Sequence, residues 1–292
     1  MASIEILAGG LFTTVQDLGR PSGSLGGFPW GGVMDRRSAK YANSLISNSS
    51  VTALLEITLI GPKIRFEDNR SIAITGADLS PSINNRRIYN DTLITINKGD
   101  VLSFGKTNSG CRAYLAINGG INVPLVLGST STYTYAKMGG YKGRNLMKGD
   151  VLNLHAVSNN SFKKIEKLSS TRIISQPCII PCLYGPEYDL FSNELKEQLE
   201  NTIFKINAQS NRMGYRLDLE QPMTHKVPEI ISSGTVRGTI QLPTSGNPIV
   251  LMADSPTTGG YPRIANCTEE GTDLLAQCKP GDSIIFQMIN NL

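Results

Sequence analysis

Lys98-Gly99-Asp100-Val101-Leu102-Ser103-Phe104 is the first of three copies of one pattern in this chain. The other two are Lys148-Gly149-Asp150-Val151-Leu152-Asn153-Leu154 and Pro280-Gly281-Asp282-Ser283-Ile284-Ile285-Phe286. Glycine followed by aspartate is typical of a tight turn, and the apolar residues that follow are typical of a strand. We therefore interpret the three aspartates as turn residues that lead into strands of barrel-like sheets, and not as a catalytic set.

Similar apolar runs, separated by turn signals, continue along the chain, which has 29 glycines and 15 prolines. Short runs rich in Val, Ile, Thr and Leu predict strands. The predicted strands are Leu55–Leu59, Ile72–Thr75, Leu93–Ile96, Arg112–Ile117, Arg172–Ser175 and Ile249–Met252. The chain is therefore expected to be mainly β.

Two helices are predicted, each behind a residue that can accept a hydrogen bond from the first helical turn. Asp35 precedes the predicted helix Arg36–Ser47, and Ser192 precedes the predicted helix Asn193–Phe204. In the second helix, two leucines four residues apart share one face. We expect both helices to decorate sheets.

The length of 292 residues is long for one compact core and predicts two domains. The polar stretch from Ser158 to Ser170 has no clear period and cannot bury much apolar surface, so it is the best candidate for a linker. We place an N-terminal β-rich domain at residues 1–157 and a C-terminal domain at residues 171–292.

Composition excludes several classes of function. The formal charge of +4 comes from 28 basic and 24 acidic residues that are scattered along the chain, so no nucleic acid partner is expected. No apolar run reaches the about 18 residues of a membrane span, and no secretion signal is present. The five cysteines lack the paired spacing of zinc or redox sites, which predicts no metal and a reducing cytoplasm.

Three polar, glycine-containing segments in the second half are the densest candidates for a site: Ser210–Leu217, Gly238–Pro243 and Thr257–Pro262. Gly259 and Gly260 allow the backbone to approach a ligand and to present N–H groups to an anion. Thr257 and Thr258 add hydroxyl donors. The alternative for these four residues is a tight hairpin with capping threonines.

Arginine and glutamine side chains extend this candidate site. Arg212 and Arg263 carry planar forks that suit carboxylate or phosphate, although an isolated arginine is more often a solvated surface residue. Gln241 offers both a donor and an acceptor to a cyclic amide. In the first half, Thr13–Arg20 and Gly31–Asp35 have a similar mixture of small, amide and arginine residues, and the two regions are candidates for the walls of one cleft.

Other chemistries find little support. His155 and His225 are not near a serine or cysteine in a nucleophile-elbow motif, which argues against a Ser-His-Asp hydrolase. No G-x-x-x-x-G-K-[ST] motif occurs, so ATP would have to bind another loop or another subunit. Ala136-Lys137-Met138 superficially resembles the Met-Lys-Met motif of a biotin acceptor. Its flanking residues are those of a loop inside a larger domain, so no biotin is expected on this chain. Cys178 and Cys182 flank an apolar segment and are interpreted as packing residues.

A series of motifs, all in the same order, resembles one family nearly from end to end. They are Thr13–Arg20, Gly31–Asp35, Ala42-Asn43, Leu55–Leu59, Gly61-Pro62, Gly76–Asp78, Asn118–Ile121, Val123-Pro124, Leu127–Ser129, Gly143-Arg144, Gly185–Glu187, Arg212–Leu217, Pro248–Asp254 and Thr257–Pro262. By these motifs the chain is identified as a member of the family that includes the C-type subunit of 5-oxoprolinase, KipA-like proteins and allophanate hydrolase subunit 2. The family is also called the biotin-dependent carboxyltransferase domain family.

The resemblance implies two cyclophilin-like β-barrel domains with a few short helices. It also implies a cytoplasmic subunit, inactive alone, of an ATP-dependent 5-oxoprolinase that hydrolyses 5-oxo-L-proline to L-glutamate. The implied partners are a B-type subunit of similar fold and an A-type subunit, and ATP is the cofactor of the complex. Phosphorylation of the lactam would make ring opening easier, because phosphate is a better leaving group than an oxide.

The resemblance also implies roles for particular residues. Arg212, with Thr257, Thr258, Gly259 and Gly260, would stabilise charge on the lactam oxygen or on the transferred phosphate. The remaining assignments are Gln241 and Gln16 to orient the amide, Asp254 or Asp17 as a base or an orienting carboxylate, and Tyr261 and Arg20 in substrate or phosphate binding.

Two alternatives remain open. One is the carboxyltransferase component of a biotin-dependent carboxylase that acts on urea-like amides, with a biotin carrier on another protein. The other is a KipA-like regulatory antagonist of a kinase inhibitor. The chain also departs from the family pattern at Asn211, Ser233 and Pro256, where aspartate, glutamate and glutamine are usual, and the loss of two acids points to an altered substrate or to a subunit without activity.

Overall fold

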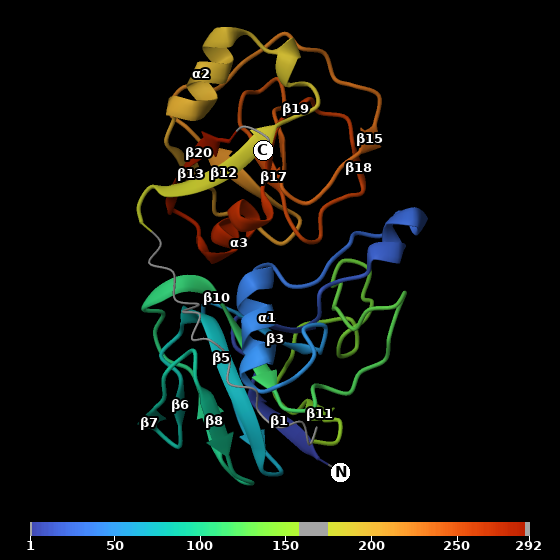
Figure 1. The fold of residues 1–292 in the computed structure, drawn as a ribbon, viewed down its shortest axis with the longest axis vertical. Coiled ribbons are helices and arrows are strands. Elements are labelled where there is room, and N and C mark those ends of the chain that lie inside the picture. The colour runs from blue at the N-terminus through green and yellow to red at the C-terminus, as the bar shows by residue number, and fades with distance from the viewer. Residues whose placement is uncertain (1, 158–174, 290–292) are drawn as a thin grey trace. The chain divides into compact units, whose positions relative to one another are not determined.

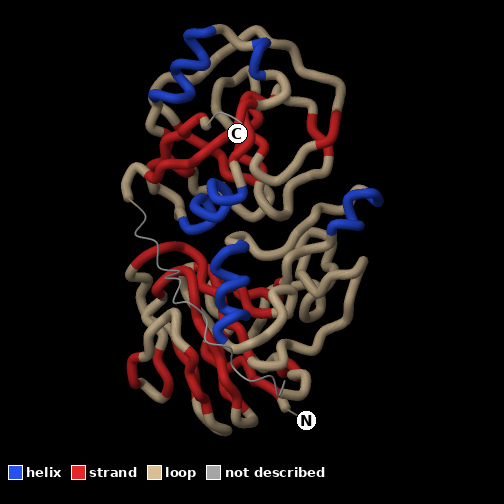
Figure 2. Tube along the Cα trace, in the orientation of Figure 1, coloured by secondary structure: helices blue, strands red, loops and turns tan. Residues whose placement is uncertain are grey.

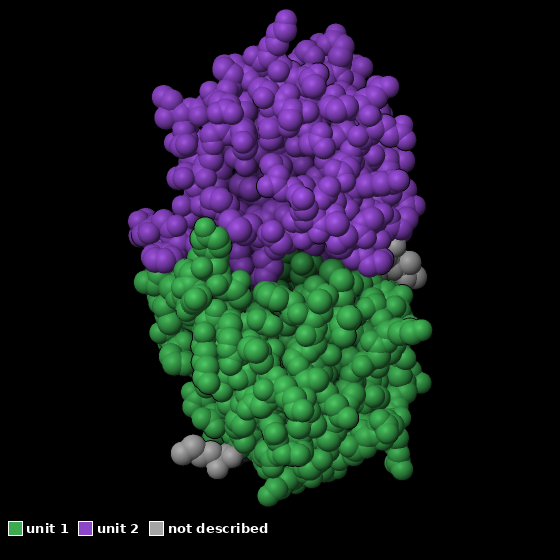
Figure 3. Space-filling model, turned by 180° about the vertical axis from the view of Figure 1, so that it is seen from behind, with its two compact units in different colours: residues 1–20, 31–173 green, residues 21–30, 174–292 purple. Residues whose placement is uncertain are grey.

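The computed structural model of this protein describes residues 2–157 and 175–289. The chain divides into two compact units, Met1–Arg20 with Gly31–Ile173 and Pro21–Trp30 with Ile174–Leu292 (Figure 3). Strands and loops dominate both units, and the helices are few and short (Figures 1 and 2). This confirms the prediction of a mainly β fold. The predicted linker Ser158–Ser170 lies outside the described residues, and the predicted domain boundaries stay a prediction.

The first unit contains two antiparallel sheets. The six-stranded sheet has the order β11 (Val151–Asn153), β1 (Ser3–Ala8), β4 (Lys63–Phe66), β9 (Val101–Ser103), β6 (Ser82–Ile83) and β7 (Arg86–Arg87). The five-stranded sheet has the order β2 (Phe12–Gln16), β3 (Leu54–Thr58), β10 (Ser109–Ile117), β5 (Arg70–Asp78) and β8 (Leu93–Ile96). The predicted strands in this part of the chain are confirmed, with ends that differ by a few residues.

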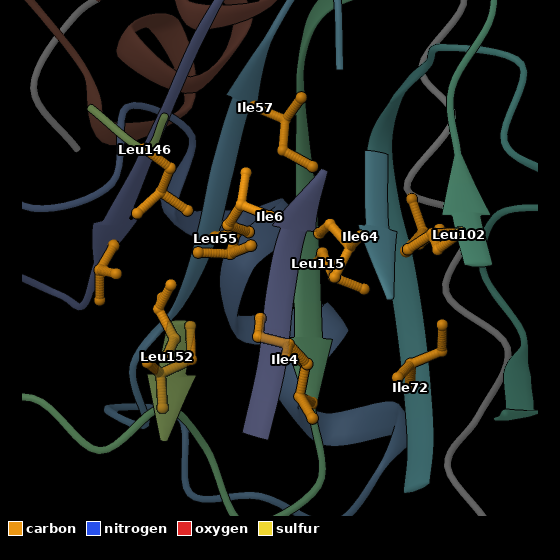
Figure 4. Packing of buried hydrophobic residues seen from close by; sticks show 14 of the residues in the cluster. Ile4, Ile6, Leu55, Ile57, Ile64, Ile72, Leu102, Leu115, Leu146 and Leu152 are labelled. Atoms are coloured by element: carbon orange, nitrogen blue, oxygen red, sulfur yellow. The ribbon is translucent and has the colours of Figure 1, made fainter. Parts of the chain in front are cut away.

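The two sheets bury a common apolar core (Figure 4). Alternate residues of a strand point to opposite faces, so one face of each strand supplies the core. Ile4 and Ile64 come from the six-stranded sheet, and Leu55, Ile72 and Leu115 come from the five-stranded sheet. All five are fully buried, and burial of such a side chain contributes about 1.5–3 kcal/mol. This core holds the first unit together.

The opposite face of the five-stranded sheet is covered by helix α1 (Arg36–Leu45), as predicted. Asp35 caps the helix by accepting a hydrogen bond from the Ser38 N–H at 2.9 Å. The helix is shorter than predicted because Ser47, its expected last residue, has a left-handed φ of 56°. The buried residues of this second layer are Val33, Ala39, Ala42, Ile46, Leu54, Ala73, Tyr114 and Ala116.

The second unit is built around a closed barrel. Its strands follow the order β12 (Cys178–Tyr184), β19 (Arg263–Cys267), β16 (Thr239–Gln241), β17 (Ile249–Leu251), β14 (Gly214–Asp218), β13 (Phe204–Ile206) and β20 (Ser283–Met288). β20 pairs with β12 in parallel and so completes the ring. A separate two-stranded ribbon joins β15 (Ser233–Gly234) to β18 (Thr258–Gly259).

Short helices complete the second unit. They are η1 (Pro21–Gly26), η2 (Tyr188–Leu190), α2 (Asn193–Asn201) and α3 (Glu269–Gln277). The Ser192 hydroxyl caps α2 as predicted, by accepting a hydrogen bond from the Leu195 N–H at 3.4 Å. Among the described residues, no helix combines the length and the apolar character that crossing a membrane requires.

Three expectations for the second half need correction or completion. α2 ends before Phe204, because Phe204 begins β13 and is fully buried in the barrel. In the predicted strand Arg172–Ser175, the first three residues lie outside the described residues, and Ser175 is not in a strand; the strand β12 begins at Cys178. α3 was not predicted, although Thr268 caps it and two acidic residues follow in its first turn.

The cysteines of β12 pack in the barrel, as predicted. Cys178 and Cys182 are buried, and Cys182 lies directly opposite Cys267 of β19 with the two sulfurs 3.6 Å apart. The hydrogen bond with Cys267, together with burial, raises the pKa of Cys182 above its usual range. Its thiol therefore stays protonated at neutral pH and is no nucleophile.

The repeated glycine-aspartate pattern folds into the same turn three times. In each copy the aspartate carboxylate accepts a hydrogen bond from the N–H three residues earlier, at 2.8 Å from Asn97, 2.8 Å from Met147 and 2.9 Å from Lys279. The central glycines have φ of 91°, 90° and 88°, which only glycine adopts readily. The glycine N–H groups donate in turn to the carbonyl oxygens of Phe66, Ile6 and Ile206, residues of the strands β4, β1 and β13. The structural interpretation of the three aspartates is confirmed.

Replacing the glycine of one such turn is expected to destabilise the protein. Gly281→Ala places a Cβ on a left-handed residue, so the free energy of unfolding should fall by about 1–2 kcal/mol in a urea titration followed by circular dichroism. Gly234→Ala is the matched control, since Gly234 has no left-handed φ and its added Cβ meets no atom within 4 Å. Equal stability of the two variants would contradict this account of the turn.

Candidate functional site

Gln241, the last residue of β16, lies at the centre of the candidate site in the second unit. Its side chain is largely buried. The side-chain amide forms no hydrogen bond with another described residue. Gly259 of β18 lies directly against it, because a Cβ added at Gly259 would overlap Gln241 Nε2. The structure therefore brings these two predicted residues together and leaves an amide donor and acceptor for a ligand.

The ribbon that carries Gly259 is extended. Ser233 pairs with Gly259 and Gly234 pairs with Thr258, while the Thr235 N–H donates to the Thr257 carbonyl at 2.9 Å. Neither Gly259 nor Gly260 has a left-handed φ, so the ribbon lacks the alternating backbone of an anion-binding nest. The phosphate-binding role of Thr257, Thr258, Gly259 and Gly260 stays a prediction, as does that of the partly exposed Tyr261.

Arg263 fixes this ribbon to the barrel. Its guanidinium donates to both carboxylate oxygens of Glu187, at 2.7 and 2.5 Å, and its Nη1 donates to the Gly234 carbonyl at 2.7 Å. These hydrogen bonds from Arg263 hold the pKa of Glu187 below its usual range. Arg263 therefore serves to position β15, and Glu187, which the sequence analysis assigned no role, orients Arg263.

Arg212 and Asp254 form a second buried ion pair. Arg212 Nε lies 2.8 Å from one oxygen of Asp254, and Nη2 lies 2.9 Å from the other. The Asp254 N–H also donates to the Arg212 carbonyl at 2.8 Å, so the pair joins the loop before β14 to the loop after β17. Because both carboxylate oxygens bind Arg212, the geometry favours the orienting role of Asp254 over the role of a base.

The three departures from the family pattern have different local roles. Asn211 accepts a hydrogen bond from the Met213 N–H at 2.8 Å and shapes the loop that carries Arg212. The Pro256 carbonyl accepts from the Thr235 hydroxyl at 2.7 Å. The Ser233 hydroxyl is buried and has no hydrogen-bond partner within the described part of the chain. Since Ser233 pairs with Gly259, its hydroxyl is a further polar group of this ribbon that a ligand can use.

The predicted residues of the first unit form a separate buried network. Gln16 Nε2 donates to the Thr14 hydroxyl and to the Thr132 carbonyl, at 3.0 and 3.1 Å. Arg20 is fully buried and donates to the Ser131 carbonyl. The carboxylate of Asp17 accepts five hydrogen bonds of 2.5–2.9 Å, from Gly19 N–H, Ser129 Oγ, Thr130 N–H, Thr130 Oγ1 and Ser131 Oγ. So many donors suit Asp17 to organising the loop around residues 129–132.

The first unit also contains a buried polar cluster that was not predicted from the sequence. Glu56 accepts hydrogen bonds from the Met34 N–H at 2.6 Å and from the Tyr114 hydroxyl at 3.0 Å, and that hydroxyl accepts from the Asp35 N–H at 2.7 Å. Burial, followed by the charges of Glu56 and Asp35, raises the pKa of Tyr114 well above its usual range. The available signal was a single acid in the apolar strand Leu54–Thr58.

A hollow of the second unit is lined by residues other than the candidate-site residues of that unit. It has a volume of about 540 Å³ and is lined by α2, Tyr188 and parts of β12 and β20. It contains none of the residues predicted from the sequence. The candidate site is therefore defined by Gln241, by Gly259 that lies against it and by Ser233 that pairs with Gly259, and not by this hollow.

Comparison with known proteins now adds to this geometry. The family described as carboxyltransferase domain, subdomain A and B, matches residues 26–288. The chain is 35% identical to the C-type subunit of 5-oxoprolinase from Escherichia coli strain K12, over 97% of this chain and 90% of that protein. It is 34% identical to urea amidolyase of Lachancea kluyveri over 99% of this chain, but spans only 17% of that protein. The crystal structure of Kluyveromyces lactis urea carboxylase matches 99% of this chain and 27% of that one, with 34% identity and a TM-score of 0.88.

Acidification is expected to weaken the Glu187–Arg263 pair. Since the folded-state pKa of Glu187 is lowered, its contribution to stability is present above the unfolded pKa of about 4.3 and is lost as the pH falls through the folded-state value. Glu187→Gln should cost about 1.5–3 kcal/mol near neutral pH in urea unfolding. Between about pH 6 and about pH 2, the free energy of unfolding of this variant should also fall less than that of the wild type.

The exposed Glu229→Gln variant controls for removal of a carboxylate from the same unit. It should follow the wild-type curve at every pH. Parallel curves for Glu187→Gln and the wild type would disprove the proposed importance of the pair.

Gly259→Ala tests the contact between the ribbon and Gln241. The added methyl group meets the end of a flexible side chain, so the free energy of unfolding should fall by less than about 1 kcal/mol while the Gln241 amide moves. The Gln241 side-chain NH₂ resonances in ¹⁵N NMR should shift in Gly259→Ala and stay in place in Gly234→Ala. Unmoved resonances in Gly259→Ala would show that the two residues are not in contact.

Proposed function

Because the chain belongs to the carboxyltransferase domain family, subdomains A and B, we propose that it is a subunit of an ATP-dependent 5-oxoprolinase complex. The complex hydrolyses 5-oxo-L-proline to L-glutamate in the cytoplasm, where ATP is available. The observation that carries the proposal is the 35% identity to the C-type subunit of Escherichia coli 5-oxoprolinase, which extends over nearly the whole of both chains. Because that relative is named as one subunit of an enzyme, partners are expected, and we assign them as an A-type and a B-type subunit.

The candidate site suits a lactam. A lactam presents one carbonyl acceptor beside one N–H donor, and the unused amide of Gln241 offers the complementary donor and acceptor. Transfer of the terminal phosphoryl group of ATP to the lactam oxygen releases ADP and activates the carbonyl carbon. Attack of one water on that carbon, with cleavage of its bond to nitrogen, opens the ring to an acyl phosphate. A second water then hydrolyses the acyl phosphate to phosphate and the carboxylate of glutamate. The Ser233 hydroxyl, on the residue that pairs with Gly259, is the donor that we assign to the negative charge of these steps.

ATP itself is assigned to the complex and not to a particular loop of this chain. No P-loop motif occurs in the sequence, and the extended ribbon at Gly259 and Gly260 lacks a nest for phosphate. We therefore propose that another loop or a partner subunit binds most of the nucleotide. This chain would then contribute to recognition of the lactam, which is consistent with a subunit that is inactive alone.

A second candidate function rests on the likeness to the urea-handling enzymes. The match to Kluyveromyces lactis urea carboxylase, with a TM-score of 0.88, supports a carboxyltransferase component that acts on urea-like amides. A urea-like amide presents the same donor and acceptor groups to Gln241 as a lactam does. In this case the biotin carrier would be another polypeptide, and Lys137 of this chain would remain unmodified.

Reconstitution separates the two functions. This chain, with its presumed A-type and B-type subunits, should release glutamate from 5-oxoproline in the presence of ATP, and the activity should disappear when any one protein is omitted. An intact complex without glutamate release would refute the oxoprolinase function. Biotin-dependent carboxylation of urea by this chain, together with a carrier and a biotin carboxylase, would support the second function instead.

Gln241→Ala is expected to reduce kcat/KM for 5-oxoproline by about 10- to 100-fold, because the amide of the substrate loses its partner. The effect should appear mainly as an increase of KM if Gln241 binds the ground state and the transition state equally. Gln209→Ala, a change on an exposed loop, is the control and should keep the wild-type kinetics. Wild-type kinetics in Gln241→Ala would remove Gln241 from the site.

A further inference from the structure

Arg263 is an arginine that lies beside Gln241 in the candidate site. The two residues are partners in the antiparallel pair of β16 with β19. Arg263 Nη1 also donates to the Gly234 carbonyl of the ribbon at 2.7 Å. Ser233, the preceding residue of the ribbon, pairs with Gly259, and Gly259 lies against Gln241. The strand pairing and the ribbon thus both place a guanidinium near the Gln241 amide.

The charge of this guanidinium is balanced by Glu187. Arg263 Nε and Nη2 donate to the two carboxylate oxygens, and the Arg263 N–H donates to the same carboxylate at 3.0 Å. Neither side chain of the pair has more than 15% of its surface exposed. Because the hydrogen bonds from Arg263 hold the pKa of Glu187 below its usual range, the carboxylate is charged at neutral pH. The pair beside Gln241 therefore has no net charge.

Two more arginines of this part of the chain are balanced in the same way. Arg212 binds both oxygens of Asp254, as described above. Arg237, which lies between β15 and β16, is 3.5 Å from a carboxylate oxygen of Asp273. The four side chains of these pairs are largely buried. Each of the three arginines thus has a carboxylate of this chain as its partner.

This balance of charge bears on the two groups of 5-oxoproline differently. Its lactam is neutral, and the donor and acceptor of the lactam match the Gln241 amide. Its carboxylate is ionised at neutral pH. A carboxylate that leaves water for a site of balanced ion pairs loses its hydration and gains no new cation, so its transfer is unfavourable.

We infer that Glu187 determines the specificity of the candidate site: by neutralising Arg263, it makes the site select the neutral lactam group of a ligand and not a carboxylate. This chain then recognises the lactam ring of 5-oxoproline, and recognition of the carboxylate is left to the rest of the complex. The inference rests on the proposed function, in which Gln241 binds the lactam.

Titration of the full chain with two lactams tests this inference. The probes are 5-oxoproline and 2-pyrrolidinone, which lacks the carboxylate, and the readout is the shift of the Gln241 side-chain NH₂ resonances in ¹⁵N NMR. The wild type should bind 2-pyrrolidinone at least as tightly as 5-oxoproline. In Glu187→Gln the Arg263 charge is no longer balanced, so the ratio of the two Kd values should move about tenfold in favour of 5-oxoproline. Salt at about 1 M should reduce this change, because it screens the charge.

The ratio separates charge from structure, since a displaced ribbon would weaken both lactams alike. Glu187→Gln with Arg263→Gln removes both charges, and this double variant should return the ratio to within about twofold of the wild type. Glu197→Gln is the matched control, because Glu197 lies on α2 and lines the hollow and not the candidate site. It should keep the wild-type ratio.

The wild-type preference decides the inference even where a variant is too unstable to fold. A wild-type chain that binds 5-oxoproline more tightly than 2-pyrrolidinone, or an unchanged ratio in folded Glu187→Gln, would overturn the role of Glu187 alone. In that case, glutamate release by the reconstituted complex would still support the proposed function. Failure of both lactams to shift the Gln241 resonances would overturn the inference and remove Gln241 from lactam recognition. An intact complex that releases no glutamate would overturn the proposed function itself.

Discussion

The glycine-aspartate turn is the constraint on which both units depend. Each copy combines a glycine of left-handed φ with a carboxylate that accepts a hydrogen bond from a backbone N–H. In each copy the glycine N–H donates a hydrogen bond to a neighbouring strand. The turns at Asp100 and Asp150 place β9 and β11 in the six-stranded sheet of the first unit. The turn at Asp282 places β20, which closes the barrel by pairing with both β12 and β13. Since β16 carries Gln241 in that same barrel, the position of the candidate site depends on the third turn.

Local patterns sufficed to predict much of the fold. Short apolar runs and the glycine-aspartate pattern located about half of the strands of the first unit, and capping residues located the starts of α1 and α2. The ends of these helices were harder to predict. Ser47 has a left-handed φ that a helix does not allow, and Phe204 is buried in the barrel as part of β13. The parallel pairing of β12 with β20 joins segments from opposite ends of the unit, and no local signal in the sequence reports it.

The roles of the candidate-site residues stay a prediction, because the sequence names the residues but not the partners that hold them. Arg212, Asp254 and Asp17 look like chemical groups in the sequence, yet each is held by neighbours that give it a positioning role. Their partners lie far along the chain, 42 residues apart for Arg212 and Asp254, so only the fold reveals the pairs. Gln241 and Ser233 differ from these residues, because their side-chain polar groups are buried and have no hydrogen-bond partner among the described residues. Such unsatisfied polar groups are available to recognise a ligand.

Closure of the barrel by its first and last strands has a consequence for folding. The ring forms only when β20 reaches β12, and the intervening chain includes every other strand of the barrel. Contacts of such long sequence separation form slowly, because the entropy of closing the loop opposes them. During synthesis, the edge of β12 therefore stays open until β20 has left the ribosome, and the barrel closes only after all of its other strands have been made.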